Sequence, residues 1–222
     1  MEYTQIKYSD EIENKLFPLQ KEEYIRLIVL DTANLYNGKS FETEDDKILN
    51  FISEQKKSTY DFIITKTGKI YKLSPDNKCG TFLKLDLYSE FISRLLPDYC
   101  PQTDGSIYPH KKTPDQIAIS ILIECDNDPL TNIDCGVLTD YTKESLEDLI
   151  AYYMNVYGIS SKYIIGRNKL PKMDSDVKRF GPSFMKNDSV TFILIISYAM
   201  AISRNDPNIE LIKSFDLDFE SD

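Results

Sequence analysis

The sequence predicts an α/β protein with a central mixed β-sheet and helices packed on it. Segments of β-branched and aliphatic residues, typical of buried strands, alternate along the 222-residue chain with segments whose apolar residues recur at helical spacing. Two further apolar runs are separated only by a Lys-Thr-Gly turn, which predicts a β-hairpin. The order of these segments is strand, helix, hairpin, loop, strand, helix, short strand and loop.

The strands are predicted from continuous or alternating apolar runs. Residues 24–31, YIRLIVLD, are β-branched and flanked by polar residues, as in a buried strand. The hairpin occupies 59–73, TYDFIITKTGKIYKL, and 116–124, QIAISILIE, form another core strand. A short strand is expected at the start of 162–184, where it enters a long loop.

Two helices are predicted from apolar spacing and from their end residues. The first covers 43–57, where Thr43 stands three residues before Asp46 as a weak form of capping box. The second covers 142–157, with Thr142 able to cap it and Gly158 ending it. The expected apolar faces are Ile48, Leu49 and Ile52 in the first helix, and Ser145, Leu146, Leu149, Ile150, Tyr153 and Val156 in the second.

The chain is expected to form one main domain with additions. Residues 1–23 are polar and are interpreted as an N-terminal arm. The main domain covers 24–185 and carries an insertion at about 85–115, in which 85–96 have helical spacing. Residues 186–222 contain an apolar segment and an acidic tail.

Composition excludes several classes of function. The net charge of −10 repels phosphate backbones, so nucleic acid is not expected as a partner. The longest apolar run, Val190 to Ile202, is too short for a membrane span. The N-terminus lacks the pattern of a signal peptide, and no two of the four cysteines lie two residues apart, so cytoplasmic synthesis with reduced thiols is expected.

Four motifs, in order, resemble a known family. The hairpin is similar to YHFVIDRDGTIYQL, and IVLDTAN, AISILIE and IIGRNKL are similar to IVLHHTA, SIGIELV and IIGHRDV. A further segment, RFGPSF, stands in the place of DPGPXF. Together these motifs make the stretch of about 24–185 resemble the zinc-dependent N-acetylmuramoyl-L-alanine amidases of the peptidoglycan-recognition family. The resemblance implies the amidase fold, with Tyr60 at the place of a Tyr that assists the metal-bound water.

The same alignment implies a degenerate site, in which Asp31, Arg167 and Arg179 stand at the three zinc-ligand positions. Only Asp31 can bind zinc, because a guanidinium has no free lone pair. A shifted alignment places Gly181 instead of Arg179. After Tyr60 the family has His, whereas this chain has Asp61. No metal or other cofactor is therefore expected.

Each substitution has two interpretations. In the first, the former ligand positions have drifted to solvated polar residues. In the second, Asp31 pairs with Arg167 or Arg179, and a salt bridge fills the metal site. Tyr60 is expected to be a packing residue with its hydroxyl at the surface, and the alternative is a catalytic remnant.

The remaining candidate residues are interpreted as structural. His110, the only histidine, lies in a Pro-Lys loop and is expected to be exposed. Cys79 and Cys125 are candidates to lie near each other, but a cysteine nucleophile needs a base. The segment GKS at 38–40 lacks the upstream Gly of a P-loop. An acidic loop, expected to be solvated, contains Glu124, Asp126, Asp128 and Asp134.

The sequence therefore favours a pseudoenzyme, that is, an inactive amidase-fold protein that is a structural component of a larger protein assembly. Such an assembly would be a bacteriophage tail or baseplate, which is part of a virion, or a related cell-envelope machine. A peptidoglycan-binding module and an active cell-wall amidase with a rearranged site are the alternatives.

Overall fold

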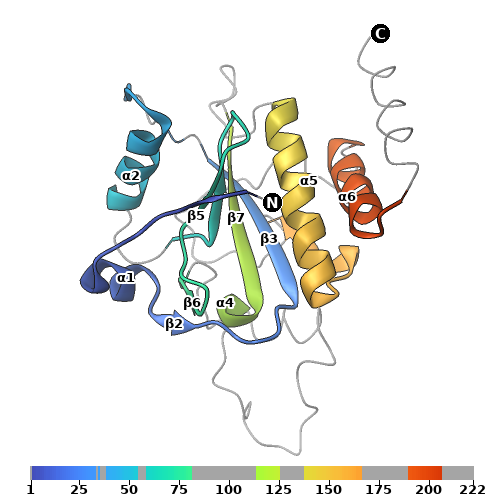
Figure 1. The fold of residues 1–222 in the computed structure, drawn as a ribbon, viewed down its shortest axis with the longest axis horizontal. Helices are drawn as coiled ribbons and strands as arrows, with labels where there is room; N and C mark the ends of the chain where they lie inside the picture. Colours follow the sequence, from blue (N-terminus) through green and yellow to red (C-terminus); the bar gives the residue numbers. More distant parts are fainter. Residues whose placement is uncertain are drawn as a thin grey trace, which may run out of the picture.

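The structure is a computed structural model that describes residues 2–33, 35, 39–54, 59–81, 114–125, 138–166 and 190–206. A six-stranded sheet with the order β1-β5-β4-β7-β3-β8 forms its centre, and helices pack against it (Figure 1). The predicted fold class, α/β with a central mixed sheet flanked by helices, is confirmed.

The long central strands of the sheet are parallel. Strand β3 (Leu27–Ala33) lies between β7 (Ala118–Glu124) and β8 (Ile164–Gly166), and β4 (Phe62–Ile64) lies on the other side of β7. Strand β5 (Ile70–Lys72) is antiparallel to β4 and completes the predicted hairpin. The sheet is therefore mixed, because this hairpin is added to the edge of a parallel core.

Both faces of the sheet are covered, which explains the continuous apolar runs of its strands. In β3, Ile28 and Leu30 belong to a core cluster with residues of α5 and α6. Leu27 and Val29 alternate with them and belong to a second cluster, with residues of α1 and α2. We call the second side the α2 face, because α2 positions one residue of the candidate site described below.

Helix α5 (Asp140–Tyr157) packs on the first face beside α6 (Val190–Ser203). Its N-cap is Thr139, whose side chain accepts a hydrogen bond from the backbone N–H of Thr142, and it ends at Gly158 in the left-handed conformation. The prediction that Thr142 is the cap was wrong. Thr142 is fully buried, and its hydroxyl donates to the Thr65 carbonyl in the hairpin. Val156 is 52% exposed, so its assignment to the buried face was also wrong.

Helix α2 (Glu44–Glu54) begins where the capping pattern predicts. The Thr43 hydroxyl accepts from the Asp46 backbone N–H at 3.1 Å. Ile48 and Ile52 are buried as expected, but Leu49 is 51% exposed and was wrongly assigned to the stripe. Lys47 is buried in its place, because a partner for its charge lies on the sheet.

The hairpin tip is fastened to the start of α5. Gly68 has φ +80°, and a Cβ there would lie 2.6 Å from the Tyr141 carbonyl oxygen, so the turn requires glycine. The hydroxyl of Ser145 donates to the Gly68 carbonyl, and that of Thr139 donates to the Lys66 carbonyl. These contacts hold the strand β4, and the residues just before it, in a fixed place.

The N-terminal residues add three short elements. Strand β1 (Thr4–Gln5) pairs in parallel with β5 at the sheet edge, and α1 (Asp10–Leu16) follows. Strand β2 (Leu19–Gln20) pairs with β6 (Lys78–Cys79) in a separate two-stranded sheet. Leu16 and Phe17 are buried on the α2 face.

Element boundaries differ from the predictions mainly at strand starts. Tyr24 is 64% exposed and β3 begins at Leu27, because the chain enters the sheet only there. A short helix, α4 (Pro114–Ile117), precedes β7, and a 3-10 turn (Ser161–Tyr163) precedes β8. The predicted turn at Asn37-Gly38 and the helical spacing over 85–96 lie outside the described residues.

Candidate functional site

Asp31 and Tyr60 meet on the α2 face. Asp31 lies near the carboxyl end of β3 and is 4% exposed, and Tyr60 lies two residues before the start of β4 and is 8% exposed. The Tyr60 hydroxyl donates to Asp31 Oδ2 at 2.7 Å, and the Thr32 backbone N–H donates to Oδ1 at 3.0 Å. Both carboxylate oxygens thus accept hydrogen bonds from within the chain.

The prediction that the Tyr60 hydroxyl lies at the surface was wrong. The Tyr60 ring packs in the apolar cluster of the α2 face, so its hydroxyl is enclosed and needs a partner there. Asp31 supplies that partner. The expectation that Tyr60 packs in the core was correct.

A second buried couple joins Glu124 to Lys47. Glu124 ends β7, and Lys47 comes from α2. Lys47 Nζ lies 2.8 Å from both Glu124 carboxylate oxygens, and the Lys66 backbone N–H donates to Oε2 at 3.1 Å. The two side chains are only 4% and 0% exposed, and Glu44 Oε1 lies 3.9 Å from the same ammonium.

The prediction that Glu124 belongs to a solvated acidic loop was therefore wrong. Its side chain points to the α2 face, since Leu122 two residues earlier belongs to the core cluster of that face. Lys47 was missed altogether. It neighbours Ile48 in the helical pattern, but the sequence alone gave no sign of a buried carboxylate opposite it.

The two couples are close in the sheet. Asp31 is in register with Leu122, so Glu124 is the diagonal neighbour two residues further along β7. Diagonal neighbours on one face of a sheet have Cα atoms about 7–8 Å apart. Open α/β sheets bind ligands beyond the carboxyl ends of their parallel strands, and the couples lie toward that end. Asp31, Tyr60, Glu124 and Lys47 therefore form the candidate site.

A third polar group lies near the other end of β7. Asp61 is 3% exposed and accepts hydrogen bonds from the Ser120 backbone N–H at 2.8 Å and from its hydroxyl at 2.9 Å. Lys21 Nζ lies 2.8 Å from both oxygens of Asp61. Burial lowers the pKa of nearby Lys72, while the charge of Asp61 raises it. At the position where the resembled family has His, Asp61 thus ties β4 to β7 and to the segment before β3.

The side chains that the structure describes at this site do not fit a zinc ion. A zinc site needs at least three protein ligands, and Asp31 already accepts hydrogen bonds on both oxygens. Within the described ranges, no group of three or more His, Cys, Asp and Glu side chains is placed to hold a metal ion. Arg167, Arg179 and Gly181 lie outside these ranges, so the pairing of Asp31 with Arg167 or Arg179 and its alternative, drift to solvated residues, both remain untested interpretations. His110, Asp126, Asp128 and Asp134 lie outside them too.

The proximity predicted for Cys79 and Cys125 was wrong. Cys79 lies in β6, and its thiol is influenced by charges that include Asp115, just before β7. Cys125 follows the other end of β7, about 20 Å away along a seven-residue strand. Both cysteines are buried. Burial raises the pKa of the Cys79 thiol to about 12, so this thiol is not suited to act as a nucleophile.

No family model matches the chain, and no curated protein does. Among solved structures, PlyL is similar with a TM-score of 0.53 and 10% identity, over 90% of this chain and 97% of that one. A selenomethionine derivative of AmpD gives 0.48 and 15%, over 87% and 93%. The endolysin N-acetylmuramoyl-L-alanine amidase LysCS from Clostridium intestinale gives 0.45 and 16%, over 81% and 89%.

At 10% identity, the likeness to PlyL concerns the fold alone. In the described part of the chain, no helix is long and apolar enough to cross a membrane. The chain has a mixed α/β fold that is similar to the fold of PlyL.

Proposed function

We propose that this chain is a catalytically inactive amidase-fold protein that serves as a structural or assembly component, in a bacteriophage tail or baseplate or in a related cell-envelope machine. The proposal is supported chiefly by Asp31. This carboxylate stands where the resembled amidases have a zinc-binding His, yet it is buried and holds the Tyr60 hydroxyl and the Thr32 N–H.

The chemistry of the aligned residues supports the loss of activity. Hydrolysis by zinc needs three protein ligands and an open position for water, so that the metal can lower the pKa of that water. Two of the aligned positions carry Arg167 and Arg179 in the sequence, which have no lone pair to offer. The third, Asp31, has both oxygens engaged inside the chain.

The second couple supports a scaffold function for the same face. Lys47 neutralises Glu124 inside the protein, at hydrogen-bond distance from both of its oxygens. A buried polar network that is satisfied within the chain makes the fold rigid and specific, and it offers few groups to a substrate. With a net charge of −10, such a scaffold would assemble against basic or neutral partner surfaces.

The test combines metal analysis with a cell-wall assay. The purified protein should retain less than stoichiometric zinc after dialysis against zinc and then against metal-free buffer. It should release no amide-linked peptide from purified cell walls, with or without added zinc. Zinc-dependent release that is abolished by Tyr60→Phe would overturn the proposal, because it would assign Tyr60 a catalytic function.

A pull-down on purified cell walls separates the remaining alternative. Retention without hydrolysis would identify a peptidoglycan-binding module, whose groove still holds peptidoglycan fragments. The absence of retention, together with the absence of hydrolysis, is the result that the assembly function predicts.

A further inference from the structure

Five aromatic rings form a continuous row from β1 to α5. The Tyr3 ring packs edge-on against Phe62 with a centroid distance of 6.4 Å, and Phe62 contacts Tyr153 at 5.8 Å. Tyr153 in turn contacts Tyr152 at 5.1 Å and stacks on Tyr157 at 5.9 Å, with the two rings 7° from parallel. The row lies on the α5 face of the sheet, because Phe62 and Tyr153 belong to the core cluster of that face.

The inner rings anchor the outer ones. Phe62 and Tyr153 are 1% and 8% exposed, whereas Tyr3 and Tyr152 are 45% and 46% exposed. An exposed tyrosine that is already fixed by a neighbouring ring loses little further freedom on binding. Tyrosine is also enriched at protein interfaces and among the residues that dominate binding energy. The exposed rings therefore have the physical character of interface anchors.

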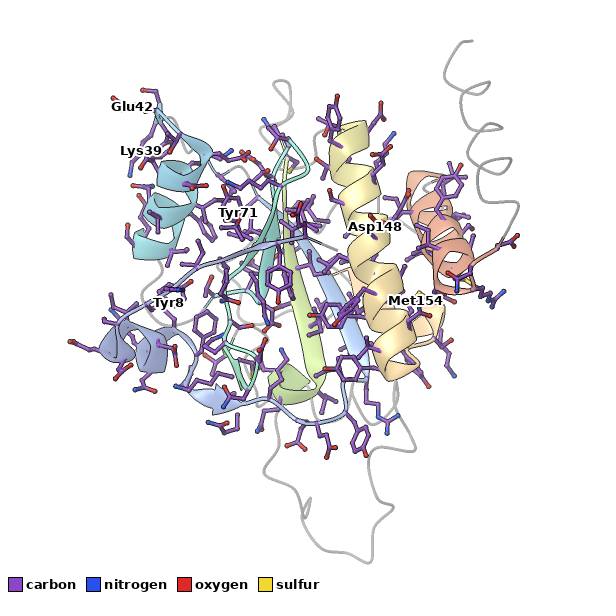
Figure 2. All side chains as sticks on the ribbon, in the orientation of Figure 1. Tyr8, Lys39, Glu42, Tyr71, Asp148 and Met154 are labelled. Atoms are coloured by element: carbon purple, nitrogen blue, oxygen red, sulfur yellow. The ribbon has the colours of Figure 1, made fainter. Side chains whose placement is uncertain are left out.

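Two carboxylates lie on the same side of α5 as Tyr152. Glu144, Asp148 and Tyr152 are spaced by four residues, which places them on one exposed face of the helix (Figure 2 labels Asp148). The Tyr3 ring is already occupied by a cation, since Lys72 Nζ lies 5.4 Å from its centroid, whereas Tyr152 lies one helical turn from Asp148. An exposed aromatic ring beside a carboxylate suits a guanidinium, which stacks on the ring and pairs with the acid.

We propose that Tyr152 and Asp148, one helical turn apart on α5, form a docking surface for an arginine-bearing segment of a partner protein. The net charge of −10 favours such a basic partner over an acidic or neutral one. This surface and the Asp31–Tyr60 couple lie on opposite faces of the sheet. The two proposals thus rest on different residues, and either can fail without the other.

The experiment uses the whole chain and a defined probe. A capped peptide with three arginines separated by glycines is titrated by calorimetry, and a matched peptide carries citrulline in place of arginine. Tyr152→Ala should weaken binding of the arginine peptide about tenfold. Asp148→Asn should weaken it less, and Tyr152→Phe should retain most of the affinity because the ring remains.

Tyr141→Ala is the matched control. Tyr141 is a tyrosine on the same helix and is 69% exposed, but its ring contacts none of the five rings in the row. This variant should bind the arginine peptide like the unchanged protein. Circular dichroism and thermal unfolding of each variant check that the fold is kept, and Tyr152→Phe provides the comparison if Tyr152→Ala unfolds.

Four results would overturn the proposal. Equal losses in Tyr152→Ala and Tyr141→Ala would leave only general interaction with an acidic surface. Equal binding of the citrulline peptide would show that the charge of arginine is not recognised. Absence of binding at about 1 mM peptide would exclude an arginine site of useful affinity. Binding of an N-acetylglucosamine oligomer that depends on Tyr152, without binding of the arginine peptide, would identify a glycan surface instead.

Discussion

Replacing Lys47 by methionine should destabilise the protein by about 3–5 kcal/mol, the usual cost of leaving one member of a buried ion pair without its partner. The ion pair between Lys47 and Glu124 is deeply buried. Both side chains are 4% exposed or less, and Lys47 Nζ lies 2.8 Å from each oxygen of Glu124. In Lys47→Met, the Glu124 carboxylate would keep the Lys66 N–H but lose its counter-charge.

The change should be measured by thermal and urea unfolding at neutral pH. For a chain of this length, 1 kcal/mol corresponds to roughly 2–4 °C in Tm, so a fall of about 6–20 °C is expected. The double variant Lys47→Met with Glu124→Gln should be more stable than either single variant. It removes both charges together and keeps an acceptor for the Lys66 N–H.

Lys39→Met is the matched control for this prediction. Lys39 pairs with Glu54 at the end of α2, but those side chains are 50% and 42% exposed. Water and salt screen an exposed pair, so its loss should leave Tm nearly unchanged. If Lys47→Met is as mild as Lys39→Met, or if the two changes at the buried pair are simply additive, the pair does not fix α2 to the sheet.

Three further predictions concern the hairpin turn, acid stability and a thiol. Gly68→Ala should cost about 1–3 kcal/mol in urea unfolding, whereas Gly158→Ala, which also has positive φ but no neighbour within 4 Å, should cost only about 1–2 kcal/mol. The Lys69 hydrogen bond lowers the pKa of the Asp45 carboxyl. The ionised Asp45 carboxylate thus contributes to stability above its usual pKa of about 3.9, and this contribution is lost as the pH falls below that value. In Asp45→Asn, the urea midpoint should therefore fall less steeply with decreasing pH. Cys79, buried and with its pKa raised to about 12, should react with iodoacetamide at about pH 8 far more slowly in the folded protein than after denaturation, as peptide mass spectrometry would show.

Local patterns predicted most of the fold correctly. The hairpin at Phe62–Ile64 and Ile70–Lys72, the core of β7 and the end of α5 at Gly158 all follow from residues adjacent in the chain. Such features are encoded locally, because turn chemistry, capping and apolar periodicity act within a few residues. Predictions failed where a distant residue decided the outcome. Thr142 faces the hairpin and does not cap α5, because a backbone carbonyl of that hairpin needs its hydroxyl.

The sequence likewise predicted only part of the candidate site. The sequence by itself determined that Asp31 lies toward the end of an apolar strand, that Tyr60 precedes the hairpin strands, and that neither Arg167 nor Arg179 can bind a metal. Only the tertiary structure decided that the Tyr60 hydroxyl meets Asp31 and that Lys47 meets Glu124, 29 and 77 positions apart. A buried charge or hydroxyl must find a partner in space, and the order of strands in the sheet determines which residues are within reach.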